Sequence, residues 1–278
     1  MKPPLLLIGY GTDDDCGVVE FGRFVHRLRC RLGHIAADVC GAFLDDAQPS
    51  LSESVASLVA RGHHRLVALP FALTGNEPDR AGIPSAMAIE QERHPTLMYD
   101  YGRAVGPDPR VLALLAERLA DAQAEIPRLS PVLALVTHGD QAGESASIAL
   151  SDTAIVLVGA GSTDPAANAD VHRVSRLLWE THAAAYLTVE TAFVSPLARP
   201  GVPGGLERCR RLGAKRVIIL PYLMFADAVL ERVWAQAMAY AAGHEGMEIR
   251  CAEAIGDCEG LADVVIERYE DALSGTSS

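Results

Sequence analysis

The chain has 278 residues, of which 49% are apolar and 22% charged, a balance typical of a globular protein large enough for two ordinary domains. Its net charge of −12 argues against a nucleic-acid partner, because neutralising phosphates needs a basic face. The apolar runs are too short to cross a membrane, the order and length of the first segments are not those expected of a signal peptide, and the six cysteines form no C-x-x-C pair. We therefore expect a cytoplasmic protein with reduced thiols and no membrane partner.

The first half of the chain alternates short apolar runs with amphipathic stretches. Four runs are short, β-branched or aromatic, and bounded by Gly or Pro, which predicts strands at Leu5–Ile8, Asp38–Phe43, Arg65–Leu69 and Leu97–Tyr101. Helical spacing of apolar residues predicts helices at Val18–Leu32, Ser50–Ala60, Ala81–Arg93 and Asp108–Ala122. This alternation predicts an α/β fold with a parallel sheet that is covered by helices on both faces.

The second half repeats the first at an offset of 150 residues (158 against 8), with one slipped residue. The clearest paired blocks are 8–12 with 158–162, 42–44 with 192–194, and 66–70 with 217–221. The repeated strands are expected at Ile155–Val158, Thr188–Phe193, Arg216–Leu220 and Glu248–Ala252. We therefore predict two tandem α/β/α lobes, at 1–123 and 152–278, that are related by duplication and joined by a linker at 124–151.

A G-x-G loop follows the first strand of each repeat. Ligands of open parallel sheets bind beyond the carboxyl ends of the strands, so two facing repeats are expected to enclose one cleft between these loops. Glycines there allow close backbone approach, and free N–H groups at a helix start can hold a carboxylate. The candidate substrate-binding residues are Gly9, Gly11, Thr12, Gly159, Gly161 and Ser162.

Motifs in both halves carry a resemblance to a known family. Residues 5–13 and 42–45, and in the second half 158–165 and 220–222, resemble the long-form CbiX-type sirohydrochlorin chelatases. The resemblance implies a class II chelatase fold and a role in cobalamin or sirohaem biosynthesis. It also implies that a divalent metal, Co²⁺ in most such enzymes, is inserted into a tetrapyrrole. The metal would then be a substrate, and no cofactor would be permanently bound.

The resemblance further implies metal-binding histidines in the loops after the first and third strands, and a carboxylate after the second. This sequence has Tyr10 and Pro78 at the two histidine positions, and it keeps the carboxylate as Asp45. Glu77 precedes Pro78, in a loop expected to face the cleft. We therefore assign Glu77 and Asp45 as metal ligand and base, and Tyr10 as a wall of the cavity. The alternative for Asp45 is an acid that favours the start of the next helix.

His138 is a third candidate metal ligand, because it precedes a glycine after an apolar run and so mimics the expected histidine loop. It lies in the linker, where a chance match is the competing interpretation. The first functional hypothesis is a chelatase acting on a tetrapyrrole. The alternatives are a non-catalytic tetrapyrrole carrier and a related enzyme recruited to another small anionic substrate. Since two repeats complete the cleft within one chain, we expect a monomer, or a dimer that the site does not need.

Overall fold

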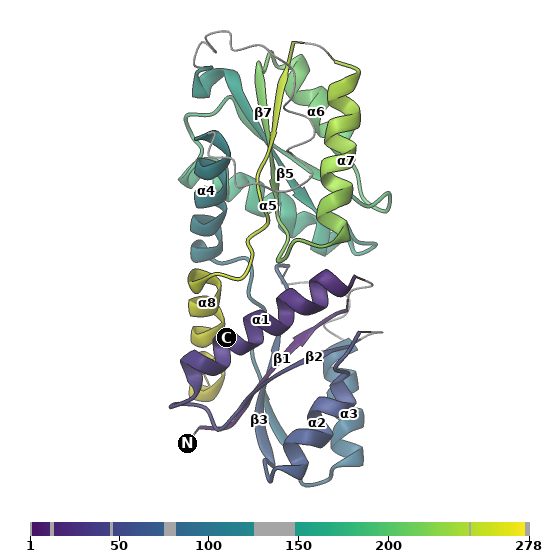
Figure 1. Cartoon of the computed structure of the whole chain (residues 1–278), viewed down its shortest axis with the longest axis vertical. Coiled ribbons are helices and arrows are strands. Elements are labelled where there is room, and N and C mark those ends of the chain that lie inside the picture. Colours follow the sequence, from purple (N-terminus) through teal and green to yellow (C-terminus); the bar gives the residue numbers. More distant parts are fainter. Residues whose placement is uncertain are drawn as a thin grey trace.

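A computed structural model describes residues 2–11, 14–44, 47–74, 82–124, 148–244 and 246–275. It shows two α/β lobes stacked along the long axis of the molecule (Figure 1). Each lobe is built on a four-stranded parallel sheet, in the order β2-β1-β3-β4 in one and β6-β5-β7-β8 in the other. The predicted fold class, two tandem parallel-sheet lobes related by duplication, is confirmed.

Strands and helices alternate through both repeats, close to the predicted bounds. In the first repeat they are β1 Leu5–Gly9, α1 Asp15–Leu32, β2 Val39–Phe43, α2 Leu51–Ala60, β3 Arg65–Pro70, α3 Gly82–Arg93, β4 Met98–Tyr101 and α4 Pro109–Gln123. In the second they are β5 Thr153–Gly159, α5 Pro165–Thr181, β6 Thr188–Phe193, α6 Val202–Arg211, β7 Arg216–Pro221, α7 Ala228–Ala242, β8 Glu248–Cys251 and α8 Glu259–Ser274. None of the described helices is long and apolar enough to cross a membrane.

The first strand of each repeat, β1 or β5, is an inner strand of its sheet and is buried on both faces, as its uninterrupted apolar sequence predicts. In β1, Leu6 and Ile8 pack into a core under α2 and α3, whereas Leu5 and Leu7 point to the opposite face. On that opposite face a single apolar cluster continues from Leu5 and Leu7 to Ile155 and Leu157 of β5. The two lobes therefore share one continuous core along one side of the molecule.

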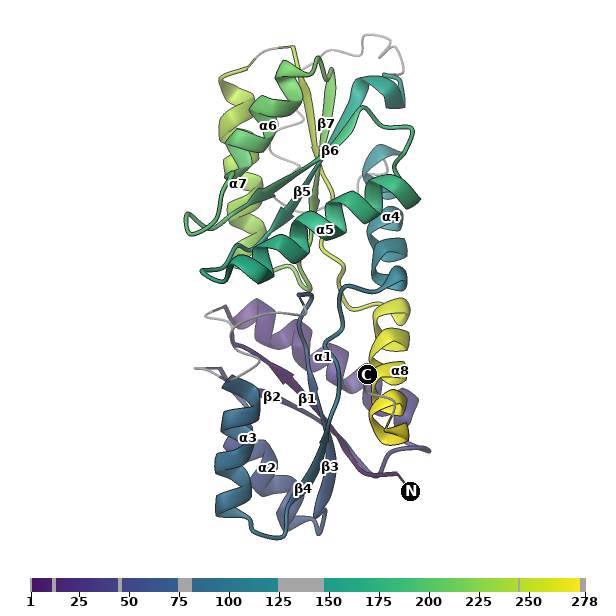
Figure 2. The same ribbon diagram turned by 180° about the vertical axis from the view of Figure 1, so that it is seen from behind.

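The last helix of each repeat packs on the lobe of the other repeat. α4 contacts β7, β8 and α5, whereas α8 contacts β3, β4 and α1. Both views place α4 beside the upper lobe and α8 beside the lower one (Figures 1 and 2). The bounds 1–123, 124–151 and 152–278 stay predictions from the sequence, and in space each lobe takes one helix from the other repeat. Because α4 and α8 each pack on the other repeat's sheet, the apolar cluster shared by the two lobes lies on the side of the molecule where these two helices lie.

Two arginines in equivalent positions hold the exchanged helices in place. Arg118 of α4 donates from Nε to the carbonyl of Ala254 at 3.0 Å and from Nη2 to that of Ile255 at 2.8 Å. Arg268 of α8, 150 positions later, donates from Nε to the carbonyl of Ala104 at 3.1 Å. Each guanidinium therefore satisfies backbone carbonyls that follow the last strand of the opposite repeat.

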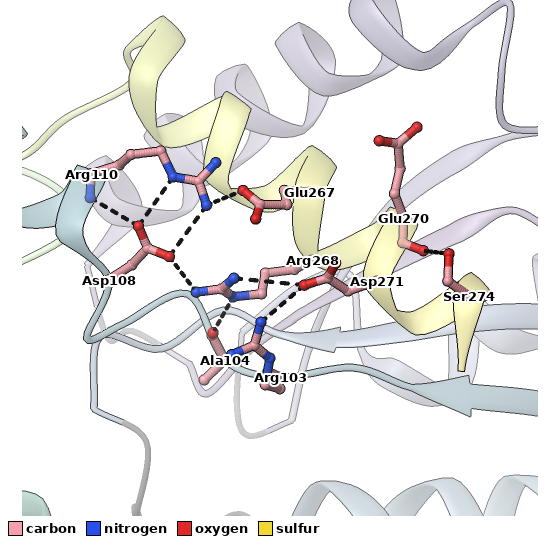
Figure 3. A network of polar contacts seen from close by, with 9 residues as sticks. All are labelled: Arg103, Ala104, Asp108, Arg110, Glu267, Arg268, Glu270, Asp271 and Ser274. Atoms are coloured by element: carbon pink, nitrogen blue, oxygen red, sulfur yellow. Dashed lines mark hydrogen bonds and ion pairs between the residues drawn. The ribbon is translucent and has the colours of Figure 1, made fainter. Parts of the chain in front are cut away.

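Arg268 also takes part in a buried ion pair, and the residue that matches its partner in the second repeat is a cysteine. Nη2 of Arg268 lies 2.6 Å from Oδ2 of Asp108, and their side chains are 6% and 8% exposed. Asp108 caps α4 by accepting the N–H of Arg110 at 2.9 Å, and Arg110 reaches on to Glu267 (Figure 3). At the position that matches Asp108, the second repeat has Cys258, which makes no side-chain cap.

The lobes also meet at Gly106, where a side chain has no room. The hydroxyl of Tyr222 donates to the carbonyl of Leu73 at 2.7 Å, and a Cβ on Gly106 would lie 2.2 Å from that carbonyl oxygen. We expect Gly106→Ala to lower the free energy of unfolding by about 3 kcal/mol, because the neighbouring backbone cannot give way. Chemical denaturation measures this difference.

Gly22 of α1 is the matched control for Gly106, since a Cβ there would meet nothing within 4 Å. Gly22→Ala is expected to stabilise the protein by about 0.5–1 kcal/mol, because alanine favours a helix interior more than glycine does. A Gly106→Ala variant as stable as the wild type would contradict the close packing of Gly106 against the Leu73 carbonyl.

Candidate functional site

The candidate site is a cleft of about 300 Å³ between the two lobes. In the first sheet β2 lies on one side of β1 and β3 on the other, and β6 and β7 flank β5 in the same way. The strand order therefore reverses at the carboxyl end of β1 and of β5. Segments after β1, β3, β5 and β7 line the cleft. The carboxyl ends of both sheets therefore open into one space, where ligands of such sheets bind.

Both G-x-G loops lie on the lining of this cleft. Among the candidate substrate-binding residues, the lining includes Gly9, Gly11, Gly159, Gly161 and Ser162. Gly161 has a φ of 86°, a conformation that favours glycine, and a Cβ there would lie 3.1 Å from the Cβ of Phe193. The duplication thus places two equivalent backbone turns on opposite walls of one cleft, and Tyr10 lines the same space.

One detail of the predicted anion site is wrong. We expected the N–H of Ser162 to be free for a carboxylate, but it donates to Oδ1 of Asn168 at 2.9 Å. The amide Nδ2 of Asn168 returns a hydrogen bond to the carbonyl of Ser162 at 2.8 Å, and the Ser162 hydroxyl accepts the N–H of Asp164 at 3.0 Å. The asparagine six positions after Ser162 was the signal for this closed arrangement.

Phenylalanines form much of the wall, which the sequence did not suggest. The rings of Phe21 and Phe43 have centroids 4.7 Å apart, Phe21 and Phe71 5.6 Å, and Phe71 and Phe225 5.6 Å. All four rings line the cleft, and among the described residues that do so there is no histidine, lysine or arginine. Such a wall favours a flat, largely apolar ligand body whose polar groups reach the loops.

A carboxylate that sequence reasoning missed stands at the cleft. Asp227 lines it and caps α7, accepting the N–H groups of Val229 and Leu230. Burial raises the pKa of Asp227, and the nearby Asp14 carboxylate adds to this rise, against the lowering effect of the two N–H donors. A carboxylate with a raised pKa in a cleft is a candidate for proton transfer.

The loop around Asp227 is fastened to the first repeat by carboxylates of α1 and its cap. Oδ2 of Asp14 accepts the N–H of Ala228 at 2.8 Å, and Oε2 of Glu20 accepts that of Ala226 at 3.0 Å. Burial raises the pKa of Glu20 as well, and the Ala226 N–H opposes that rise. The second repeat's third loop is therefore held over the start of α1, at the edge of the cleft.

We expect Asp227→Asn to raise the free energy of unfolding at neutral pH by about 1 kcal/mol. Asparagine caps a helix as well as aspartate does, and it removes the charge that burial and Asp14 disfavour. Because a raised pKa means that the folded protein binds the proton more tightly, the wild type gains stability as the pH falls through that pKa. The difference in the free energy of unfolding between Asp227→Asn and the wild type should therefore become smaller at acidic pH. Urea denaturation at several pH values measures this difference.

The remaining candidate residues lie outside the described residues. They are Thr12, Asp45, Glu77 and His138, and their assigned roles stay predictions from the sequence. Within the described part of the chain, no group of three or more His, Cys, Asp or Glu side chains is arranged to hold a metal ion.

The CbiX family profile matches the chain twice, at residues 4–122 and 154–272. The chain belongs to the CbiX family. A sirohydrochlorin cobaltochelatase from Priestia megaterium is 30% identical over 272 residues, which are 98% of this chain and 80% of the relative. A sirohydrochlorin ferrochelatase from the same organism is 24% identical over 270 residues, 97% of this chain and 90% of the relative. The resemblance that the motifs suggested is thereby confirmed.

Solved structures of chelatases share the fold of this CbiX protein. SirB from Bacillus subtilis with Fe³⁺ superposes with a TM-score of 0.74 at 19% identity, covering 99% of this chain and 97% of that one. SirB from Bacillus subtilis subspecies spizizenii in complex with cobalt gives a TM-score of 0.70, also at 19% identity, with the same coverage. The whole two-lobed arrangement is therefore common to these proteins.

Proposed function

We propose that this protein is a class II chelatase that inserts a divalent metal, Co²⁺ in the first instance, into sirohydrochlorin or a related tetrapyrrole. The observation that carries the proposal is the cleft between the repeats, with a G-x-G turn on each wall and a phenylalanine lining suited to a flat macrocycle. Sequence relatives over nearly the whole chain are sirohydrochlorin chelatases. The metal is a substrate, and the reaction needs no bound cofactor.

Metal insertion exchanges two pyrrole N–H protons for one divalent ion, so the site must accept protons and hold the ion briefly. No histidine stands on the described lining. The sequence predicts carboxylates for both tasks, with His138 as a further candidate metal ligand. We assign Glu77 as metal ligand and proton acceptor, assisted by Asp45, with Tyr10 against the macrocycle. Asp227 adds a carboxylate whose raised pKa makes it a better proton acceptor than an ordinary aspartate.

The visible spectrum of sirohydrochlorin tests the proposal, because the free and metallated macrocycles absorb differently. Purified protein is mixed with sirohydrochlorin and Co²⁺, and the conversion is compared with that in buffer and with protein that has been heat-denatured. Conversion faster than in buffer is the expected result. No acceleration at any protein concentration would contradict a chelatase.

The absence of histidine from the described lining favours a second candidate, a carrier that binds the tetrapyrrole without metallating it. Imidazole holds Co²⁺ more strongly than carboxylate and is a stronger base near neutral pH. A carrier would shift the spectrum of sirohydrochlorin on binding yet leave the metallation rate unchanged. An enzyme recruited to another anionic substrate would give neither effect.

A further inference from the structure

Two metal-ligating side chains lie together on the outer surface of α1, away from the lining of the cleft. His26 and Cys30 are both exposed, and they are four positions apart, so they share one face of the helix. The Nε2 atom of His26 lies 3.7 Å from Sγ of Cys30. Neither residue is among the candidate residues of the cleft.

This separation matches the edge of a tetrahedral metal site. Bonds of about 2.3 Å to sulfur and 2.0–2.1 Å to nitrogen, at a tetrahedral angle, place the two ligand atoms about 3.6 Å apart. We propose that His26 and Cys30 form a two-ligand binding site for Co²⁺ or Zn²⁺, with water in the other positions. Binding forms one metal–sulfur and one metal–nitrogen bond, and the thiol proton leaves to solvent.

The surroundings leave room for the ion and its water. His26 and Cys30 line a groove of about 720 Å³ together with three arginines and two acids: Arg23, Arg27, Arg31, Asp257 and Glu259. Nε of Arg27 lies 2.5 Å from Oδ1 of Asp257, and Arg27 also pairs with Glu259. Arg31 pairs with Glu259 and Asp263 as well. Carboxylates of the second repeat thus offset the charges of Arg27 and Arg31, which lowers the repulsion that a divalent cation meets.

The site formed by His26 and Cys30 lies outside the cleft between the lobes, on the other side of rings that line that cleft. His26 also lines a second groove, of about 580 Å³, whose walls include Phe21 and Phe43. The same two rings line the cleft between the lobes. A metal on His26 and Cys30 would therefore be held outside the cleft, and two protein ligands would bind it weakly enough to release it.

Titration of the full-length protein with Co²⁺ alone, without tetrapyrrole, tests the site. Thiolate bound to Co²⁺ gives a charge-transfer absorption that carboxylate and imidazole ligands do not give, so the cleft cannot imitate it. We expect this band in the wild type and its loss in Cys30→Ser. His26→Gln should keep the thiolate but weaken the apparent affinity at least tenfold.

Cys16→Ser is the matched control, because Cys16 is also an exposed cysteine of α1. It should keep the band and the affinity of the wild type. The site is refuted if the wild type shows no band, if the band survives in Cys30→Ser, or if His26→Gln binds Co²⁺ as well as the wild type. Because no macrocycle is present, these outcomes do not depend on whether the protein is a chelatase.

Discussion

Arg268→Ala is expected to lower the free energy of unfolding by about 3 kcal/mol, since removing one partner of a buried ion pair leaves a buried charge behind. Arg268 holds Asp108 at 2.6 Å, with both side chains less than a tenth exposed, and it also satisfies the carbonyl of Ala104. This loss of stability is at the lower end of the range for broken buried ion pairs, because Nε of Arg110 still lies 3.1 Å from Oδ1 of Asp108. Urea denaturation at neutral pH measures it.

The pH dependence of this effect follows from Asp108. Burial by itself would raise the pKa of Asp108, but hydrogen bonds from Arg110 and Arg268 outweigh burial, and the pKa is lowered from its ordinary value of 3.8. A lowered pKa in the folded state contributes stability above the unfolded pKa and loses it as the pH falls through the folded one. The difference between the wild type and Arg268→Ala should therefore be complete at neutral pH and shrink below about pH 4.

Lys215→Ala is the control for the loss of a cation. Lys215 pairs with Asp152 at 2.8 Å, but the two side chains are 65% and 39% exposed, so solvent screens the pair. Its removal should cost no more than about 0.5 kcal/mol. Similar losses in Arg268→Ala and Lys215→Ala would contradict the role of Arg268 in fixing the exchanged helix.

Glu77→Gln is expected to slow metal insertion at least a hundredfold, the scale on which a positioned proton acceptor acts. The amide keeps the shape of the side chain and removes its charge, so macrocycle affinity should stay nearly unchanged. Asp45→Asn should slow insertion less. Because the carboxylate acts in its ionised form, the wild-type rate should rise with pH through the titration of this group. Stopped-flow spectra with sirohydrochlorin and Co²⁺ measure the rate.

Glu92→Gln makes the same change of charge on an exposed position of α3 and should leave the rate unaltered. A rate in Glu77→Gln equal to that of the wild type would show that the carboxylate mechanism is wrong. If the wild type binds sirohydrochlorin but gives no rate above buffer, the carrier takes the place of the chelatase.

The strands, their burial and the position of the G-x-G turns could be predicted from the sequence, because they depend on the local pattern of apolar residues and glycines. The apolar run at Leu5–Gly9 is buried on both faces because it has no polar alternation, and the repeated G-x-G turns fall on one cleft because parallel strands end at one edge of a sheet. The exchange of α4 and α8 was not predictable in this way. The amphipathic pattern of Pro109–Gln123 says that one face is buried but not which sheet buries it.

Contacts between side chains that are distant in the sequence could not be predicted either. The wall of the cleft joins Phe21, Phe71 and Phe225, which are far apart in the sequence and show no common spacing. The Ser162 N–H was expected to be free, because a G-x-G turn alone does not reveal that Asn168 folds back on it. Asp227 was passed over for the same reason, since Asp14 and Glu20, which fasten its loop, belong to the other repeat.

The most direct test of the account is whether the cleft between the repeats holds the macrocycle. Ala160 is exposed and lines the cleft between Gly159 and Gly161, so Ala160→Trp fills the space without disturbing the core. Ala185, exposed in the turn before β6, gives the matched variant Ala185→Trp far from the cleft. Spectroscopic titration with sirohydrochlorin should show at least tenfold weaker binding for Ala160→Trp alone, about 1.4 kcal/mol. Equal affinity in the wild type and Ala160→Trp would contradict the account.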